Sequence, residues 1–195
     1  MLNRSVKVKA YEGKRYLLLF FQNCSTKHYI SKEQFLYSDD EYRYSLFGKI
    51  NYVDFKFRNF YEFLLEYPDV STSQVMIWKQ NFFPLEINQT VNSSLLISRV
   101  LKFDFPVKGS FDGLSLSPTR YTILDGQISS DYAWYSIGVN SGYMNNIGFP
   151  GYSGKVVESV RLWIKTAEFI PSCNALLIFN SNVLHLFNIF VFIFI

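Results

Sequence analysis

Imidazole side chains, the commonest general bases in enzymes, occur only twice in this sequence, as His28 and His185. His185 lies in an uncharged apolar stretch, where a general base would have neither water nor an orienting carboxylate. His28 is therefore the histidine that a hydrolase would use, and a surface histidine without a catalytic role is the simpler interpretation. The sequence has no G-x-S-x-G elbow, P-loop, G-x-G-x-x-G turn or H-E-x-x-H helix, which excludes those particular mechanisms.

Two groups of acidic residues could supply paired carboxylates. Glu62 and Glu66 share one face of a predicted strand, and their spacing corresponds to about 13 Å at 3.3 Å per residue. This exceeds the separation of the two acids in a glycosidase, so we expect both to be solvated and paired with Lys or Arg on a neighbouring strand. Asp39, Asp40 and Glu41 lack the spaced oxygen ligands of a calcium loop, and we expect a solvated loop there.

Cysteine spacing argues against a metal centre. Cys24 and Cys173 are far apart, and neither belongs to a C-x-x-C or Cys/His cluster. A structural zinc site needs four ligands at short paired spacings, so we expect no metal and no cofactor. Lone thiols of this kind are typical of buried small hydrophobic residues. The net charge of +3 is too small to indicate nucleic acid as a partner.

Tryptophan residues beside polar side chains are the more informative feature. Trp78 shares a strand face with Gln80, and Trp134 is followed directly by Tyr135. A Trp ring offers apolar area to the face of a sugar, while neighbouring polar groups offer hydrogen bonds. We therefore predict a ligand-binding role for Trp78, Gln80, Trp134, Tyr135 and Trp163. The more ordinary alternative is that Trp78 and Trp134 are core residues that close the fold.

Trp163 lies in a different setting. Its neighbours on the same face of a predicted strand are Arg161 and Lys165. We therefore expect its ring to be partly exposed, with cations over its face.

The elements that must position these residues are strands. From Tyr44 onward apolar residues recur with a period of two, and long 3.6-residue stripes are missing. The predicted strands, separated by turns that contain Pro, Gly, Asn or Asp, cover 16–21, 50–57, 60–67, 75–80, 95–107, 120–124, 132–139 and 159–165. They predict an all-β fold, a two-sheet antiparallel sandwich with jelly-roll or Greek-key connections. Ser31 followed by Lys32, Glu33 and Gln34 is the helical signal, typical of a capped first turn.

Charge divides the chain into two parts. The 19 basic and 16 acidic residues all lie at or before Glu168. We predict an N-terminal extension over 1–14, a β-sandwich domain over 15–166 and an uncharged hydrophobic tail over 167–195. The apolar run 16–21 is too short for the core of a signal peptide, and a truncated gene model would account for a missing one.

The tail from Ala175 to Ile195 contains no charged residue, and as a helix of about 30 Å it could span a bilayer. Asn180, Asn182 and His185 near its middle oppose this, because polar groups lack partners in lipid. A membrane anchor and a translated intron or read-through are equally favoured, and a buried strand is a third possibility. A GPI-type signal is the least favoured, because the small residues Ser172, Cys173 and Asn174 are not followed by a polar spacer. A genuine tail makes the protein membrane-associated; otherwise extracellular and cytoplasmic locations both stay open.

Several short strings resemble a module of large families of uncharacterised protist surface proteins. The strings that carry the resemblance, within roughly 44–165, are Y-E-F-L-L-E-Y-P at 61–68, W-K-Q at 78–80, P-L at 84–85, L-D-G at 124–126, W-Y-S-I-G at 134–138, F-P-G at 149–151 and V-R-L-W-I at 160–164. The chain departs from the pattern in a short stretch without Trp between Phe105 and Leu116. The resemblance implies a surface β-sandwich similar in architecture to galactose-binding-like domains, and it implies no particular activity.

We expect a non-enzymatic interaction module that binds a glycan or a protein surface. Five glycines from Gly138 to Gly154 suit a shaped, ligand-facing loop, so 140–155 is an expected contact region. The alternative is a hydrolase on a jelly-roll scaffold, which requires two converging carboxylates or His28 with an acid. A third possibility is a structural role, with the domain displayed at a membrane by the tail. No pattern specifies the ligand or the oligomeric state.

Overall fold

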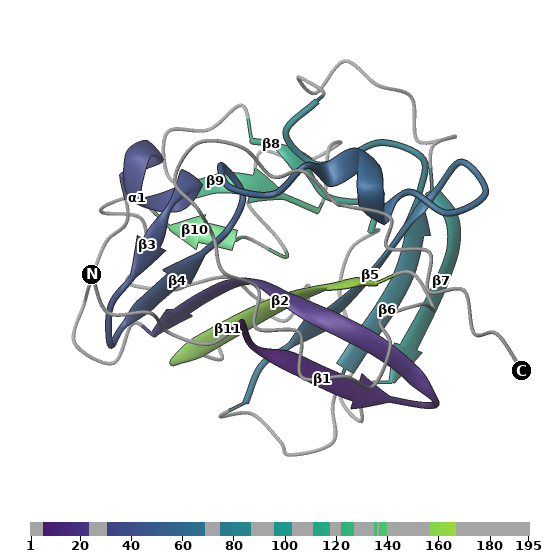
Figure 1. Cartoon of the computed structure of the whole chain (residues 1–195), viewed down its shortest axis with the longest axis horizontal. Helices are drawn as coiled ribbons and strands as arrows, with labels where there is room; N and C mark the ends of the chain where they lie inside the picture. The colour runs from purple at the N-terminus through teal and green to yellow at the C-terminus, as the bar shows by residue number, and fades with distance from the viewer. Residues whose placement is uncertain are drawn as a thin grey trace, which may run out of the picture.

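The computed structural model describes residues 6–23, 31–68, 75–86, 96–102, 111–117, 122–126, 135, 137–139 and 157–166. Within these residues the chain is mostly β, with one short α-helix and one turn of 3-10 helix (Figure 1). The elements are β1 (Val8–Tyr11), β2 (Lys14–Asn23), α1 (Lys32–Leu36), β3 (Ser38–Asp39), β4 (Arg43–Ser45), η1 (Tyr52–Phe55), β5 (Tyr61–Glu66), β6 (Val75–Gln80), β7 (Leu96–Lys102), β8 (Ser115–Leu116), β9 (Thr122–Asp125), β10 (Ile137–Val139) and β11 (Ser159–Lys165). The all-β prediction is confirmed.

The described strands form two antiparallel sheets. The large sheet has eight strands in the order β3-β4-β2-β11-β5-β6-β7, with β1 paired to β2 outside this path, and the small sheet has the order β10-β9-β8. Strand β11 is paired with β2 on one side and with β5 on the other. The last strand in the described part of the sequence therefore lies at the centre of the large sheet.

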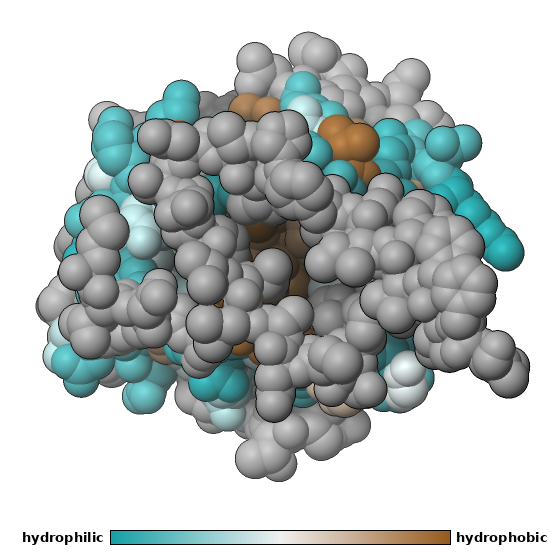
Figure 2. All heavy atoms as spheres, in the orientation of Figure 1, coloured by the Kyte–Doolittle hydropathy of each residue, from teal (hydrophilic) through white to brown (hydrophobic). Residues whose placement is uncertain are grey.

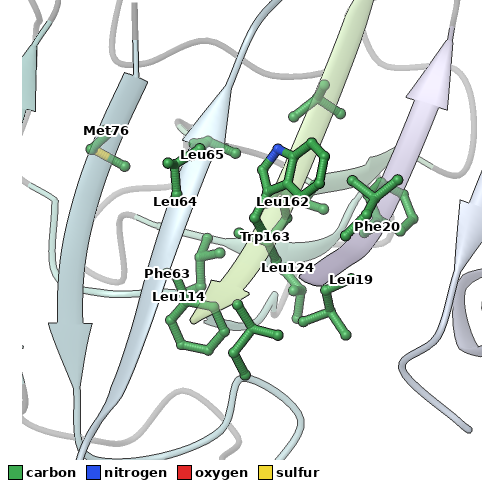
Figure 3. Close-up of a cluster of buried hydrophobic side chains, with 14 of the residues drawn as sticks. Leu19, Phe20, Phe63, Leu64, Leu65, Met76, Leu114, Leu124, Leu162 and Trp163 are labelled. Atoms are coloured by element: carbon green, nitrogen blue, oxygen red, sulfur yellow. The ribbon is translucent and has the colours of Figure 1, made fainter. Parts of the chain in front are cut away.

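The central strands of the large sheet are buried on both faces, which explains their continuous apolar runs. Tyr61–Leu65 of β5 are all buried, although successive side chains point to opposite faces of a sheet. Phe63 lies on the face that packs toward the small sheet, where its ring stacks on Trp78. Leu64 lies on the opposite, outer face, opposite Trp163 of β11 (Figure 3).

A chain of aromatic contacts joins the two sheets. The ring of Trp78 lies 5.3 Å from that of Phe63 and 5.0 Å from that of Phe111, which precedes β8. Phe111 in turn contacts Tyr135, which precedes β10, edge-on at 4.9 Å. Such pairs contribute about 0.5–1.5 kcal/mol each beyond the burial of their area.

Helix α1 packs against β2 and β10 through the side chain of Phe35. Its start is fixed by a capping box, in which the Gln34 amide donates to the Ser31 hydroxyl and the Ser31 amide donates to the Gln34 side chain. This confirms the predicted capped turn. Phe35 of the helix is fully buried, with its ring 5.1 Å from that of Phe20 on β2. The same ring lies against Gly138 of β10.

The predicted strand over 50–57 is wrong, because the segment forms the 3-10 helix η1. Asn51 accepts a hydrogen bond from the Asp54 amide through its carbonyl, and its side-chain amide donates to the Asp54 carboxylate. Such local bonds compete with sheet pairing. Tyr52 is held instead by stacking on Phe83, with ring centres 4.7 Å apart.

Of the predicted division of the chain, the structure describes part of the N-terminal extension and part of the β-sandwich domain. Residues 8–11 of the predicted N-terminal extension form β1 and pair with β2. The tail, the loop 140–155, both histidines, both cysteines and the 103–107 part of the predicted strand 95–107 lie outside the described residues. In the part of the chain that the structure describes, no helix is long and apolar enough to cross a bilayer.

Alanine substitutions at Gly138 and Gly13 test the packing of α1 on the small sheet, because both glycines have positive φ but their surroundings differ. Gly138 has φ +73° and a Cβ there would lie 2.6 Å from the Phe35 ring, whereas Gly13, at φ +74°, has nothing within 4 Å of that position. In both alanine variants the left-handed backbone conformation lowers the free energy of unfolding by about 1 kcal/mol. We expect Gly138→Ala to lose about 1–3 kcal/mol more, because it overpacks the core. Urea unfolding of the two variants measures the difference, and equal losses would contradict this packing.

Candidate functional site

Trp78 and Gln80, two of the predicted ligand-binding residues, lie in the core between the sheets. Trp78 is 1% exposed and Gln80 is fully buried. The Trp78 Nε1 donates to Gln80 Oε1 at 2.7 Å, and the same oxygen accepts from the Leu114 amide at 2.9 Å. Gln80 Nε2 donates to the carbonyls of Phe82 and Leu114, each at 3.0 Å. All polar side-chain atoms of the pair are bound within the protein, as expected for core residues.

The Gln80 side chain acts as a polar bridge between the sheets. Gln80 ends β6 of the large sheet, and Leu114 immediately precedes β8 of the small sheet. Gly113, at φ +92°, allows this approach, because a Cβ there would lie 3.2 Å from Gln80 Oε1. The W-x-Q spacing therefore encodes an inter-sheet contact in this structure.

Of the next predicted pair, Tyr135 is buried and Trp134 cannot be placed in a binding surface. Tyr135 is fully buried against Phe111 and has φ +58°. Trp134 lies outside the described residues. The structure therefore brings Trp78 and Tyr135 together, but through Phe111 and within the core.

The expectation that Trp163 is partly exposed is wrong. Trp163 is 6% exposed, because the β1–β2 hairpin brings Lys9 over its ring at 5.8 Å. Its Nε1 donates to Glu66 Oε2 at 2.8 Å, and Lys9 pairs with the other oxygen of Glu66 at 2.6 Å. The flanking cations lie over other rings, Arg161 over Phe21 and Lys165 over Phe57.

Glu62 lies beside this group on the same outer face and is held by three side chains. Lys14 Nζ donates to its Oε1 at 2.8 Å, the Tyr16 hydroxyl donates to the same oxygen at 2.7 Å, and Lys79 Nζ lies 3.9 Å from Oε2. The predicted pairing with lysine on a neighbouring strand is confirmed, since Lys79 is the register partner of Glu62 on β6. The predicted solvation is wrong, since the Glu62 side chain is 3% exposed.

Burial and hydrogen bonding act in opposite directions on these groups. Burial raises the pKa of Glu62, but the hydrogen bonds from Lys14 and Tyr16 outweigh it and hold the pKa below its usual value. Burial, followed by the hydrogen bond to Glu62, raises the pKa of the Tyr16 hydroxyl above its usual value. The pair is therefore a permanent carboxylate and a permanent phenol near neutral pH, an arrangement suited to structure rather than to proton transfer.

The carboxylate of Asp40, in the acidic turn after β3, is also bound by groups of the protein itself. Asp40 Oδ1 accepts from the amides of Tyr42 and Arg43, and Oδ2 accepts from the Arg43 guanidinium at 2.9 Å. Among the described residues, no group of three or more His, Cys, Asp or Glu side chains could hold a metal ion. The hydrolase alternative now depends on His28, which lies outside the described residues.

A tight two-residue hairpin projects beside the outer face. The Phe57 and Phe60 backbones exchange hydrogen bonds of 2.9 and 3.1 Å, and the residues between them, Arg58 and Asn59, have φ of 48° and 68°. Two consecutive left-handed residues define the turn that matches the twist of a hairpin. The turn directs Arg58 and Asn59 outward, where both are exposed.

Exposed apolar side chains and cations come together at this hairpin. We call Val53, Lys56, Phe57, Arg58 and Lys165 the basic hairpin surface. Val53 is 59% exposed and Phe57 47% exposed. Arg58 and Lys165 lie over the Phe57 ring at 5.1 and 5.5 Å. Sequence reasoning assigned this segment to a strand, although K-F-R followed by Asn was a local signal for an exposed basic turn.

Comparisons with known proteins add nothing to this geometry: no protein-family model, curated protein or solved structure matches the chain.

Replacement of Gln80 separates a core role from a ligand role. We expect Gln80→Leu to lower the free energy of unfolding by about 3 kcal/mol or more, because it leaves buried donors and acceptors of Trp78, Phe82 and Leu114 without partners. Urea unfolding of the full chain measures this loss, with exposed Asn81→Ala as the control. An unchanged unfolding free energy would show that Gln80 is not the inter-sheet bridge.

Glu62 should also give stability a characteristic pH dependence. Its folded pKa is below its unfolded value near 4.5, so its contribution is present above that pH and is lost as pH falls through the folded pKa. We expect Glu62→Gln to cost about 2 kcal/mol at neutral pH and much less in acid. Urea unfolding from pH 7 to acid tests this, with exposed Glu41→Gln as the control. A Glu62→Gln loss that stays constant with pH would contradict it.

Proposed function

We propose that this chain is a non-enzymatic interaction module that binds an anionic partner, a glycan, a protein surface or a lipid headgroup, at a surface or membrane. The observation that carries the proposal is the basic hairpin surface, in which cations and apolar side chains are exposed together. Exposed polar and aromatic groups of this kind more often serve recognition than packing.

The acidic side chains of the outer face support the same proposal. Glu62 and Glu66 are each bound by a lysine and by a ring hydroxyl or ring N–H, so both carboxylates are engaged in contacts within the protein. Ion pairing within the sheet keeps these carboxylates away from the surface, while Arg58 and Lys56 remain exposed. Exposed cations beside apolar side chains speed the encounter with an oppositely charged partner.

The fold that we propose for this module is a two-sheet sandwich of jelly-roll type. Antiparallel pairing within both sheets and the aromatic contacts between Trp78, Phe111 and Tyr135 support it. In such folds, binding groups are usually carried by the connections between strands, and all residues of the basic hairpin surface except Lys165 of β11 lie in the connection from β4 to β5.

Chromatography of the full chain on a sulfated polysaccharide resin tests this function. We expect retention that is absent on the uncharged matrix and is reversed by salt, because exposed charges are screened beyond about 10 Å at moderate ionic strength. The variant Lys56→Gln/Arg58→Gln should elute at clearly lower salt. Lys7→Gln/Lys32→Gln removes the same charge from α1 and from the residue before β1, and should elute like the wild type. No retention on the sulfated resin, or equal effects of the two variants, would contradict the proposal.

A further inference from the structure

We infer that the basic hairpin surface docks on an anionic lipid bilayer, with Val53 and Phe57 entering the headgroup region and the flanking cations pairing with lipid headgroups. This inference rests on the proposed function and names the partner for that surface.

The apolar side chains are the first part of the argument. Val53 and Phe57 are two of the four large hydrophobic residues that stand out as exposed in the described part of the chain, at 59% and 47%. They come from one short segment, whereas the other two, Val8 and Tyr37, lie on β1 and after α1. Figure 2 shows hydrophobic atoms at the surface over η1, bordered by hydrophilic side chains. Neighbouring exposed apolar groups of this kind mark an interaction site.

The surrounding charges favour an anionic partner. Arg58 and Lys165 lie over the Phe57 ring, and exposed Lys56, which precedes Phe57 in the chain, has its Nζ over the Tyr61 ring. On the acidic side, Asp54 of η1 is exposed and accepts a hydrogen bond from Asn51, exposed Glu86 is hydrogen-bonded to Tyr52 of η1, and Glu62 is buried and already paired. Two exposed cations and the half-buried Lys165 therefore stand against two exposed acids, and this small excess of positive charge favours a negatively charged layer.

The shape of the surface favours a bilayer over the other anionic partners. A sugar would stack on the face of an aromatic ring, but Arg58 and Lys165 already lie over the Phe57 ring at 5.1 and 5.5 Å. An acidic peptide is recognised by a cluster of Arg side chains, whereas Arg58 is the one arginine of this surface, and Val53 and Phe57 lie on a helical turn and a two-residue hairpin. Exposed Phe57 with cations over its ring, and exposed Val53 on the preceding turn of helix, match the combination of apolar insertion and headgroup attraction that binds proteins to membrane interfaces.

Vesicle co-sedimentation of the full chain tests the inference. The vesicles are phosphatidylcholine alone or phosphatidylcholine mixed with phosphatidylserine. We expect salt-sensitive binding to the mixed vesicles, reduced about 25-fold in Lys56→Gln/Arg58→Gln, since each cation near an anionic surface contributes about fivefold. We expect Val53→Ser/Phe57→Ser to weaken binding by about tenfold, as apolar area is lost from the contact. The matched controls Val8→Ser/Tyr37→Ser and Lys7→Gln/Lys32→Gln should bind like the wild type, and circular dichroism confirms that all variants are folded.

Each other outcome overturns the inference. Binding that is equal for the hairpin variants and their controls would place the contact elsewhere in the chain, the tail included. Retention on the sulfated resin without vesicle binding would leave the proposed function standing and show a glycan or acidic protein as the partner. No retention on the sulfated resin together with no binding to the mixed vesicles would contradict the proposed function as well.

Discussion

Strand β11 lies between β2 and β5 and hydrogen-bonds to both, although it comes from the far end of the described chain. Closing so long a connection costs chain entropy before any contact forms. The cost is offset because apolar residues of all three strands are buried together, as the cluster in Figure 3 shows. With β11 in place, Trp163 reaches Glu66 and Lys165 reaches Phe57. Both the outer-face ion pairs and the basic hairpin surface depend on this pairing.

The outer face then shows how position in the sheet decides what a charged side chain can do. Glu62 and Glu66 lie over the central strands, where burial would destabilise an unpaired carboxylate, so each is matched by a lysine and a second donor. Arg58 lies at a hairpin tip beyond the sheet and stays exposed. The two carboxylates over the central strands are therefore paired within the protein, whereas Lys56 and Arg58 beyond the sheet are exposed. This separation is the physical basis of the anion-binding surface that we propose.

Much of the strand content was accessible from the period of two in the sequence. The predictions over 60–67, 75–80 and 159–165 coincide with β5, β6 and β11. Strand β11 alternates in sequence, whereas β5 and β6 were identifiable from runs of apolar and aromatic residues that suit strands buried on both faces. The same alternation over 50–57 misled, since the hydrogen bonds between Asn51 and Asp54 close a local turn that periodicity does not register. Pairing order was not accessible either, because it depends on which distant strands β11 meets.

The chemically distinctive residues were identifiable from the sequence, but their environments were not. Trp78, Gln80 and Trp163 were recognised as unusual from their types and spacing alone, and so was the pairing of Glu62 with lysine. Their exposure depends on elements far away in the chain: Leu114 completes the hydrogen bonds of Gln80, and Lys9 covers the Trp163 ring. The sequence by itself determined the antiparallel β class and the supply of aromatic and charged side chains. Only the tertiary structure decided which of them are buried and paired and which are exposed, because burial is set by contacts between segments that local patterns do not encode.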